Sequence, residues 1–212
     1  MTALVLGSTG LIGKQLTQLL LQDSFYSKVK AISRTPLDFN HPKLENIIID
    51  FEKIKDSKDQ LKADAVFCCL GTTMKQAGSK EAFQKVDYDY PLAVAQIAKS
   101  QGTLQYLLVS ALGANKNSFI YYNQIKGRVE EDVSSIGFEA FHIFRPSLLL
   151  GERKETRDGE DSIKMIYKFF GFLIPRKYKA IESIKVAKAM VYYGKQNGKG
   201  KFVHESKELQ NF

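Results

Sequence analysis

Three glycines follow the first apolar run of the chain. Residues 2–6 (TALVL) have the composition of a β-strand, and residues 11–21 repeat leucine at helical spacing. Between them Gly7, Gly10 and Gly13 give the spacing G-x-x-G-x-x-G. Glycine permits a tight turn, a close approach of the backbone to a phosphate, and close packing of helix on strand. This arrangement is typical of a fold in which a helix N-terminus binds the pyrophosphate of a dinucleotide.

Strand-like and helix-like segments alternate along the first 150 residues. The expected strands are residues 2–6, 29–33, 47–50, 64–70, 104–110 and 139–144, and the expected helices are residues 11–21, 91–99 and 118–134. Pro91 suits the first turn of its helix, with Asp89 or Tyr90 expected near the cap. This alternation predicts an α/β fold, a doubly wound parallel sheet with helices on both faces.

The alternation weakens after Gly151. Residues 152–161 read as a charged loop, residues 163–172 and 184–193 as amphipathic helices, and residues 201–204 as a short final strand. A cluster of four aromatic residues within 163–172 is expected in the core or in a pocket wall; they are Tyr167, Phe169, Phe170 and Phe172. We expect one domain, residues 1–212, with a small C-terminal elaboration.

Composition narrows the class of protein. No apolar run approaches the roughly 20 residues of a membrane span. The first strand-like run starts at Thr2, which leaves no room for a signal peptide. Cys68 and Cys69 are adjacent in an apolar strand, so we expect them in the core on opposite faces of the sheet. A cytoplasmic protein without membrane insertion is the expectation.

The chain is basic, with a net charge of +8. Residues 151–212 hold 14 lysines and arginines against 8 acidic residues. These basic residues stand singly and no nucleic-acid-binding motif accompanies them, so a solvated basic surface is expected and no nucleic-acid partner. His41, His142 and His204 lack metal-ligand spacing, and we predict no metal site.

The end of the second expected strand bears on the choice of nucleotide. An NAD site places a carboxylate there for the ribose 2′-hydroxyl, but this strand ends at Ser33 and Arg34. An arginine binds a 2′-phosphate through charge-assisted hydrogen bonds, which favours NADP (NADPH) over NAD. Asp50 and Phe51 end the third expected strand, where the carboxylate either contacts the adenine amine or caps the next segment of the chain.

Tyr122 and Lys126 form a Y-x-x-x-K pattern on an expected helix, and four residues place both side chains on one face. A phenol has a pKa of about 10 and is a poor acid at neutral pH. A nearby ammonium stabilises the phenolate and lowers that pKa. Tyr121 lies about 140° away around the helix from Lys126, so Tyr122 is the better partner. Ser110 ends the fifth expected strand, where its hydroxyl can stabilise charge on a substrate oxygen.

Five segments resemble a known family. They are GSTGLIG at 7–13, CCLGTT at 68–73, VDYDYPLAVAQIAK at 86–99, SALGANKNSFIYYNQIKGRVEEDV at 110–133 and FRPSLLLGERKETRDGE at 144–160. The chain resembles atypical short-chain dehydrogenase/reductases, and within them the Tat-interacting-protein group of oxidoreductase-like proteins. The resemblance covers almost the whole chain.

This resemblance implies a Rossmann-like fold, NADP(H) at the glycine loop, and roles for particular residues. Tyr122 is implied as general acid/base, Lys126 on the nicotinamide ribose, and Ser110 on the carbonyl, while residues after 150 supply the substrate side. Asn115 is a candidate for the asparagine that many classical members add. The implied cofactor-binding residues are Gly7, Ser8, Thr9, Gly10, Leu11, Ile12, Gly13, Ser33, Arg34, Asp50, Phe51, Leu70, Gly71, Thr72, Thr73, Tyr122, Lys126, Pro146 and Ser147.

These expectations leave alternatives open. The first hypothesis is an NADP(H)-dependent oxidoreductase acting on a small carbonyl or alcohol substrate, as a monomer or homodimer. The second is an NADP(H)-binding regulatory or sensing module that acts through protein partners with little turnover. A third is an isomerase or epimerase that uses bound NAD(P) transiently, against which Arg34 and the short C-terminal region argue.

Overall fold

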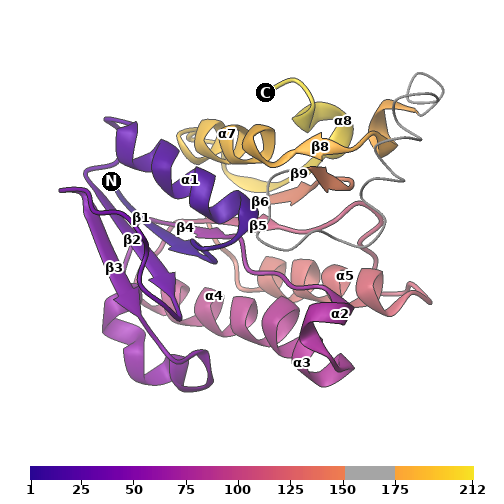
Figure 1. Cartoon of the computed structure of the whole chain (residues 1–212), viewed down its shortest axis with the longest axis horizontal. Coiled ribbons are helices and arrows are strands. Elements are labelled where there is room, and N and C mark those ends of the chain that lie inside the picture. Colours follow the sequence, from indigo (N-terminus) through magenta and orange to yellow (C-terminus); the bar gives the residue numbers. More distant parts are fainter. Residues whose placement is uncertain (151–174) are drawn as a thin grey trace.

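The computed structural model describes residues 1–150 and 175–212 (Figure 1). The strands are β1 (Thr2–Leu6), β2 (Lys28–Ser33), β3 (Leu44–Ile48), β4 (Ala65–Cys68), β5 (Gln105–Val109), β6 (Ala140–Arg145), β7 (Leu149–Leu150), β8 (Ile181–Glu182) and β9 (Gly200–Glu205). The α-helices are α1 (Leu11–Gln22), α2 (Met74–Ala77), α3 (Lys80–Gln84), α4 (Tyr90–Ser100), α5 (Tyr121–Ser135), α7 (Ser183–Gly194) and α8 (Ser206–Leu209). Two 3₁₀-helices, η1 (Phe51–Leu61) and η3 (Arg176–Tyr178), and a π-helix, η2 (Lys85–Asp89), complete the described elements.

One seven-stranded sheet, in the order β3-β2-β1-β4-β5-β6-β9, forms the centre of the molecule. Every neighbouring pair in it is parallel. The chain builds outward from β1 to β3 and then returns to add β4 on the other side of β1. In open α/β sheets, ligands bind at such a reversal, outside the carboxyl ends of the strands. The predicted doubly wound α/β fold is therefore confirmed, and its strand order reverses between β1 and β4.

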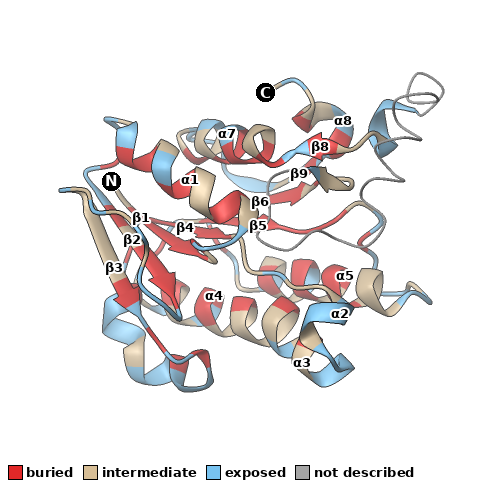
Figure 2. Cartoon of the chain, in the orientation of Figure 1, coloured by how far each residue is buried: buried red, intermediate tan, exposed pale blue. Residues whose placement is uncertain are grey.

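Each face of the sheet buries its own apolar core. Along β4 the side chains of Val66 and Cys68 join the core beneath α4 and α5, whereas Ala65 and Phe67 join the core beneath α1 and α7. Figure 1 shows these helix pairs on opposite faces, and Figure 2 shows burial concentrated in the strands and on the helix sides that face them. Successive strand residues point to opposite faces, so a strand covered on both sides must be apolar throughout.

The C-terminal residues complete the main layers of the fold. β9 pairs with β6 over six residues and adds the last strand of the sheet. α7 lies beside α1 on the same face (Figure 1). The helix expected at 184–193 and the strand expected at 201–204 are thus confirmed. The loop expected at 152–161 and the helix expected at 163–172, with its four aromatic residues, lie outside the described residues.

Two predicted boundaries were wrong. The third strand covers Leu44–Ile48 rather than 47–50, because the backbone turns after it so that Asp50 caps η1, its Oδ1 accepting from the Glu52 amide at 3.0 Å. Helix α5 begins at Tyr121 rather than at 118, because Ser118 forms a turn in which its Oγ accepts from the Ile120 amide at 3.1 Å.

Asp89 stands at the N-cap position of α4 and Pro91 in its first turn, as the sequence predicts. Asp89 nevertheless has helical backbone angles, and its side chain makes no capping hydrogen bond. The helix instead starts at α3, where Ser79 caps it, and passes through the π-helix η2 into α4. Pro91 has no N–H to donate within the helix, and a π-turn accommodates such a break in the i to i−4 pattern. Among the residues that the structure describes, no helix is both long and apolar enough to cross a bilayer.

Candidate functional site

The glycine loop between β1 and α1 is packed as tightly as its sequence predicts. Gly7 has a φ of +75°, a conformation that favours glycine. A methyl group on Gly13 would lie 2.1 Å from the Gly7 carbonyl oxygen, and one on Gly7 would lie 2.7 Å from the carbonyl oxygen of Cys69. Only hydrogen fits at these positions, so the loop presents bare backbone at the start of α1, next to the end of β4. A pyrophosphate fits this cradle, because helix N-termini offer free N–H groups and a partial positive charge.

The side chains of the loop divide into inner and outer groups. Ser8 is fully buried, and its Oγ donates to the Ile32 carbonyl at 3.3 Å. Ile12 packs into the core beneath α1, while Thr9 and Gly10 are exposed. Ser8 therefore ties the loop to β2, and of Ser8 itself only the backbone remains available to a phosphate.

The end of β2 presents Arg34 to solvent. Ser33 is buried and its Oγ donates to the carbonyl of Thr35 at 2.6 Å, which shapes the turn after the strand. The next carboxylate along the chain, Asp38, has its Oδ2 2.9 Å from Nζ of Lys14 on α1. Arg34 therefore presents a guanidinium just past the end of β2, whereas the ammonium of Lys14 is paired with Asp38.

Asp50 and Phe51 serve the structure at the end of β3. Asp50 caps η1, and the Phe51 ring is buried in the core, 5.2 Å from the ring of Tyr90. Of the two roles that the sequence left open for Asp50, capping is the one the geometry displays. A contact of Asp50 and Phe51 with an adenine remains a prediction.

The loop after β4 lies at the same edge of the sheet as the glycine loop. Leu70 packs against the core beneath α4. The Thr72 amide donates to Oδ2 of Asp87 at 2.8 Å, and Thr73 caps α2 with its Oγ1 accepting from the Gln76 amide at 3.1 Å. Gly71 lies between Leu70 and Thr72, with its backbone close to Asp87 of the π-helix η2.

Helix α5 places Tyr122, Lys126 and Glu130 four residues apart, on one face. The Tyr122 ring packs against Phe83 at 5.6 Å, and Tyr122 is close enough to Lys126 to act on its ammonium electrostatically. Tyr121 points elsewhere, since its hydroxyl donates to the Lys80 carbonyl at 3.1 Å. The structure thus brings the two residues of the Y-x-x-x-K pattern together and leaves Tyr121 out.

Lys126 has a buried counter-ion. Its Nζ lies 2.8 Å from Oδ1 of Asp87, and the two side chains are 5 % and 0 % exposed. Burial by itself lowers the pKa of Lys126, but the negative charge of Asp87 and the nearby Tyr122 raise it above its ordinary value. The pairing with Asp87 therefore favours the charged form of Lys126.

Ser110, at the end of β5, is held from the same helix. Its Oγ donates to Oε1 of Glu130, which also accepts from Nε of Arg145 at 3.0 Å. Nη2 of Arg145 reaches the other oxygen of Glu130 at 2.6 Å, and this pairing raises the pKa of Arg145 despite partial burial. The hydroxyl hydrogen of Ser110 is committed to Glu130, so Ser110 offers lone pairs to a ligand.

The residues directly after β6 connect the site to the C-terminal segment. The Pro146 carbonyl accepts from the Leu112 amide at 2.9 Å, in the loop after β5. Ser147 donates to the Lys179 carbonyl and accepts from Ser206 Oγ at 2.9 Å. Pro146 and Ser147 therefore lie at the carboxyl edge of the sheet, beside the residues after 174.

Sequence reasoning missed Asp87, Glu130 and Arg145. Glu130 was within reach, because it continues the spacing of Tyr122 and Lys126 by four residues. Asp87 stands in a segment with no recognised helical period, since the π-helix interrupts it. Asn115, the asparagine candidate, forms its own turn, with Oδ1 accepting from the Asn117 amide at 2.9 Å. The residue in contact with Lys126 is Asp87 instead.

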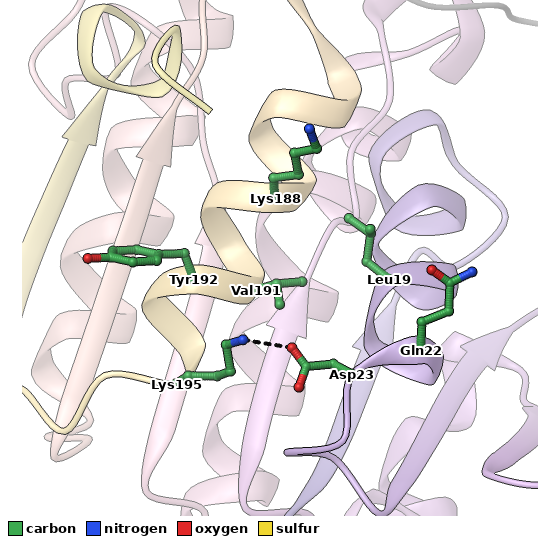
Figure 3. Close-up of a pocket in the computed structure, with 7 residues that line it drawn as sticks. All are labelled: Leu19, Gln22, Asp23, Lys188, Val191, Tyr192 and Lys195. Atoms are coloured by element: carbon green, nitrogen blue, oxygen red, sulfur yellow. Dashed lines mark hydrogen bonds and ion pairs between the residues drawn. The ribbon is translucent and has the colours of Figure 1, made fainter.

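A separate groove of about 350 Å³ lies between the carboxyl-terminal ends of α1 and α7 (Figure 3). It is lined by Leu19, Gln22, Asp23, Lys188, Val191, Tyr192 and Lys195. Two of its charged groups pair with each other, with Asp23 2.7 Å from Lys195. Because the glycine loop lies at the amino-terminal end of α1, this groove is not part of the nucleotide site.

Comparisons with known proteins agree with this arrangement. The NAD(P)H-binding family model matches residues 7–192. Protein HTATIP2 of Rattus norvegicus is 38% identical over 194 residues, which cover 88% of this chain and 78% of that protein. Protein FMP52-1, mitochondrial, of Scheffersomyces stipitis is 37% identical over 167 residues, 74% of this chain and 71% of that protein.

A solved structure shows the same fold at lower identity. The Bordetella bronchiseptica enzyme WbmH in complex with NAD+ superposes with a TM-score of 0.74 at 17% identity, covering 97% of this chain and 75% of that one. The family match and the relatives therefore establish that this chain belongs to the NAD(P)H-binding family, as an atypical short-chain dehydrogenase/reductase of the Tat-interacting-protein type.

Proposed function

We propose that the chain is an NADP(H)-dependent oxidoreductase that transfers hydride between nicotinamide and a small carbonyl or alcohol substrate. The observation that supports this most is the shared face of α5. Tyr122 and the buried ammonium of Lys126 stand on that face, at the sheet edge where the glycine loop ends. A phenol beside a fixed ammonium is suited to move a proton to or from a substrate oxygen.

The residues of the glycine loop would hold the nucleotide. Backbone N–H groups at the start of α1 would bind the pyrophosphate, since Gly7 and Gly13 keep that surface free of side chains. Gly71 to Thr73 and Pro146–Ser147 would flank the nicotinamide end, because both segments come directly after strands at the same sheet edge.

Proton transfer would fall to Tyr122. When bound, the nicotinamide supplies or accepts the hydride. Tyr122 would donate its proton to the carbonyl oxygen during reduction and recover it during alcohol oxidation. Lys126 would stabilise the phenolate left behind, and Ser110 would accept a hydrogen bond from the substrate hydroxyl or from Tyr122, since its own hydrogen goes to Glu130.

The preference for NADP over NAD rests on Arg34. This arginine is exposed just past β2, where a 2′-phosphate would lie. Its guanidinium can bind a phosphate with two parallel hydrogen bonds. WbmH is only 17% identical to this chain, so the comparison with it shows the fold alone and its bound NAD+ does not bear on the nucleotide preference.

We further propose that residues 1–212 form one domain, with residues 151–212 on the substrate side. Ser147 and Lys179 connect that segment to the end of β6, next to the predicted nicotinamide position.

A screen of small aldehydes, ketones and alcohols tests the enzyme hypothesis through the absorbance of NADPH. For a compound that is turned over, Tyr122→Phe should lower kcat by about 10²-fold or more, because it removes the proton donor. The affinity of the Tyr122→Phe variant for NADPH should change less than about threefold. Tyr121→Phe is the matched control and should keep its activity, since Tyr121 binds the Lys80 carbonyl. A fully active Tyr122→Phe variant would contradict the mechanism.

The regulatory or sensing module remains the alternative. One observation favours it: Ser110 has no free hydrogen for a substrate carbonyl, because Glu130 accepts it. Tight NADPH binding without turnover of any compound in the screen would support the module.

Location and assembly remain predictions. We expect a cytoplasmic protein, whereas the FMP52 relatives are named mitochondrial. Fluorescence microscopy of the tagged full-length protein distinguishes the two. Light scattering in solution distinguishes a monomer from a homodimer.

A further inference from the structure

Asp87 is a fully buried carboxylate at the centre of the site. It lies in η2, and its two oxygens serve different parts of the site. Oδ1 lies 2.8 Å from Nζ of Lys126, and Oδ2 accepts from the Thr72 amide at 2.8 Å. One carboxylate therefore joins the helix that bears Tyr122 to the loop after β4.

The backbone around Asp87 is arranged to reach this position. Pro91 has no N–H for the helical bond, and the chain passes through a π-turn over Lys85–Asp89. Such single π-turns are frequently found at functional sites. Gly71 lies against the ion pair, since a methyl group there would be 3.4 Å from Oδ1 of Asp87 and 3.6 Å from Nζ of Lys126.

Burial makes the pairing necessary for the charge on Lys126. An ammonium without a partner in such a place gives up its proton, because desolvation favours the neutral amine. The groups that act on Lys126 electrostatically in the described structure are Asp87 from η2, Tyr122 from α5 and Cys68 from β4. Cys68 is a buried thiol whose pKa is raised by burial, and Asp87 is the only carboxylate among these three groups.

We propose that Asp87 is a positioning residue of this site: its carboxylate keeps the buried Lys126 protonated and fixes it between Tyr122 and the loop at Gly71. This inference gives the lysine of the proposed oxidoreductase a partner, and in that sense it rests on the proposed function. It also sets the electrostatics of the site. The Asp87–Lys126 ion pair carries no net charge. The negative charge of Asp87 therefore partly offsets the electric field that the Lys126 ammonium exerts on Tyr122.

The substitution Asp87→Asn tests the proposal. Asparagine keeps the shape and one oxygen for the Thr72 amide but removes the charge. We would follow the ε-carbon signals of labelled lysines by NMR across pH, without nucleotide, and assign Lys126 by its absence in Lys126→Arg, which keeps a positive charge beside Asp87. In the unsubstituted protein the Lys126 signal should stay in its charged position to about pH 10 or above. In Asp87→Asn it should titrate at least about one pH unit lower.

The functional measurement is NADPH affinity as a function of pH. Asp87→Asn should lose about tenfold in affinity as Lys126 gives up its proton, while the unsubstituted protein loses less over the same pH range. A purely structural Asp87 would weaken binding equally at every pH. Identical titration of Lys126 with and without the substitution would overturn the proposal.

A second variant covers the case in which Asp87→Asn does not fold. Leaving a buried charge unpaired costs about 3–5 kcal/mol, whereas removing both charges is often tolerated. Asp87→Asn/Lys126→Met should then regain a cooperative thermal unfolding transition. If the double variant also fails to fold, Asp87 serves the Thr72 loop alone and the proposal is wrong. Failure of the unsubstituted protein to bind NADPH or NADH would overturn the proposed function, while the lysine titration would still decide the role of Asp87.

Discussion

Ser110 donates its only side-chain hydrogen to Glu130, one helical turn beyond Lys126. Glu130 also pairs with Arg145 through both of its oxygens. This contact joins the end of β5 to α5 and to the end of β6. It defines the serine of the site as a hydrogen-bond acceptor toward any ligand.

Glu130→Gln should destabilise the protein. The amide has one oxygen for three donors, and its NH₂ group must face either Arg145 or Ser110. We expect a loss of about 2 kcal/mol in the free energy of unfolding, measured with urea at neutral pH. Glu131→Gln is the matched control: Glu131 pairs with Lys116 at the surface, and its loss should cost under about 0.5 kcal/mol. Equal stability of the two variants would show that the Ser110 network is not structural.

Gly13→Ala should lower stability and nucleotide affinity together. The new methyl group would lie 2.1 Å from the Gly7 carbonyl oxygen, so α1 must move away from β1. We expect a cost of about 3 kcal/mol from this overpacking, read by urea unfolding, and weaker NADPH binding by calorimetry. Gln18→Ala, at an exposed position of α1, should change neither quantity appreciably. A Gly13→Ala variant with unchanged stability would contradict the close packing of the loop.

His142 and His204 form a buried pair between β6 and β9. Nδ1 of His142 lies 3.0 Å from Nε2 of His204, and Nδ1 of His204 lies 3.0 Å from Oε1 of Glu208. The His142 ring stacks on Phe202 at 4.8 Å. Burial, and then the charge of His204, lower the pKa of His142 from its ordinary 6.5 to about 4.

This pair predicts that stability falls in mild acid. Between pH 6.5 and about 4, the unfolded chain binds a proton at residue 142 that the folded chain does not. Stability therefore decreases as pH falls, by about 2 kcal/mol between about pH 7 and pH 5. His142→Phe should remove this part of the slope in urea unfolding. Phe202→Leu, which disturbs the same stack without removing an ionisable group, should shift stability about equally at both pH values. Parallel curves for His142→Phe and the unsubstituted protein would refute the prediction.

Much of the fold could be predicted from the sequence because it depends on patterns among neighbouring residues. The apolar run of β4 predicted a strand buried on both faces, and Val66 and Phe67 do enter opposite cores. The glycine spacing predicted a loop too tight for side chains, and Gly7 and Gly13 have that geometry. The start of α5 was misplaced because hydrogen bonds within the turn at Ser118, which no period reveals, determine it.

Only part of the candidate site could be predicted from the sequence, for a related reason. Tyr122 and Lys126 are linked by helical spacing, which a sequence displays directly. Asp87 is 39 positions from Lys126 and meets it only through the packing of η2 on α5. Ser8 is among the residues that the resemblance implies for cofactor binding, but its side chain faces β2. Contacts between distant segments depend on packing, and packing is what a single sequence does not display.

Arg34 is the residue on which the choice of nucleotide depends. The measurement that tests the account most directly is calorimetric titration with NADPH and, separately, NADH, repeated for Arg34→Ala. We expect the unsubstituted protein to favour NADPH, and Arg34→Ala to lose about tenfold or more in NADPH affinity with little change for NADH. Lys199→Ala removes an equal charge at the opposite end of the sheet, before β9, and should leave both affinities unchanged. Binding of neither nucleotide by the unsubstituted protein would contradict the central claim that the glycine loop is a working dinucleotide site.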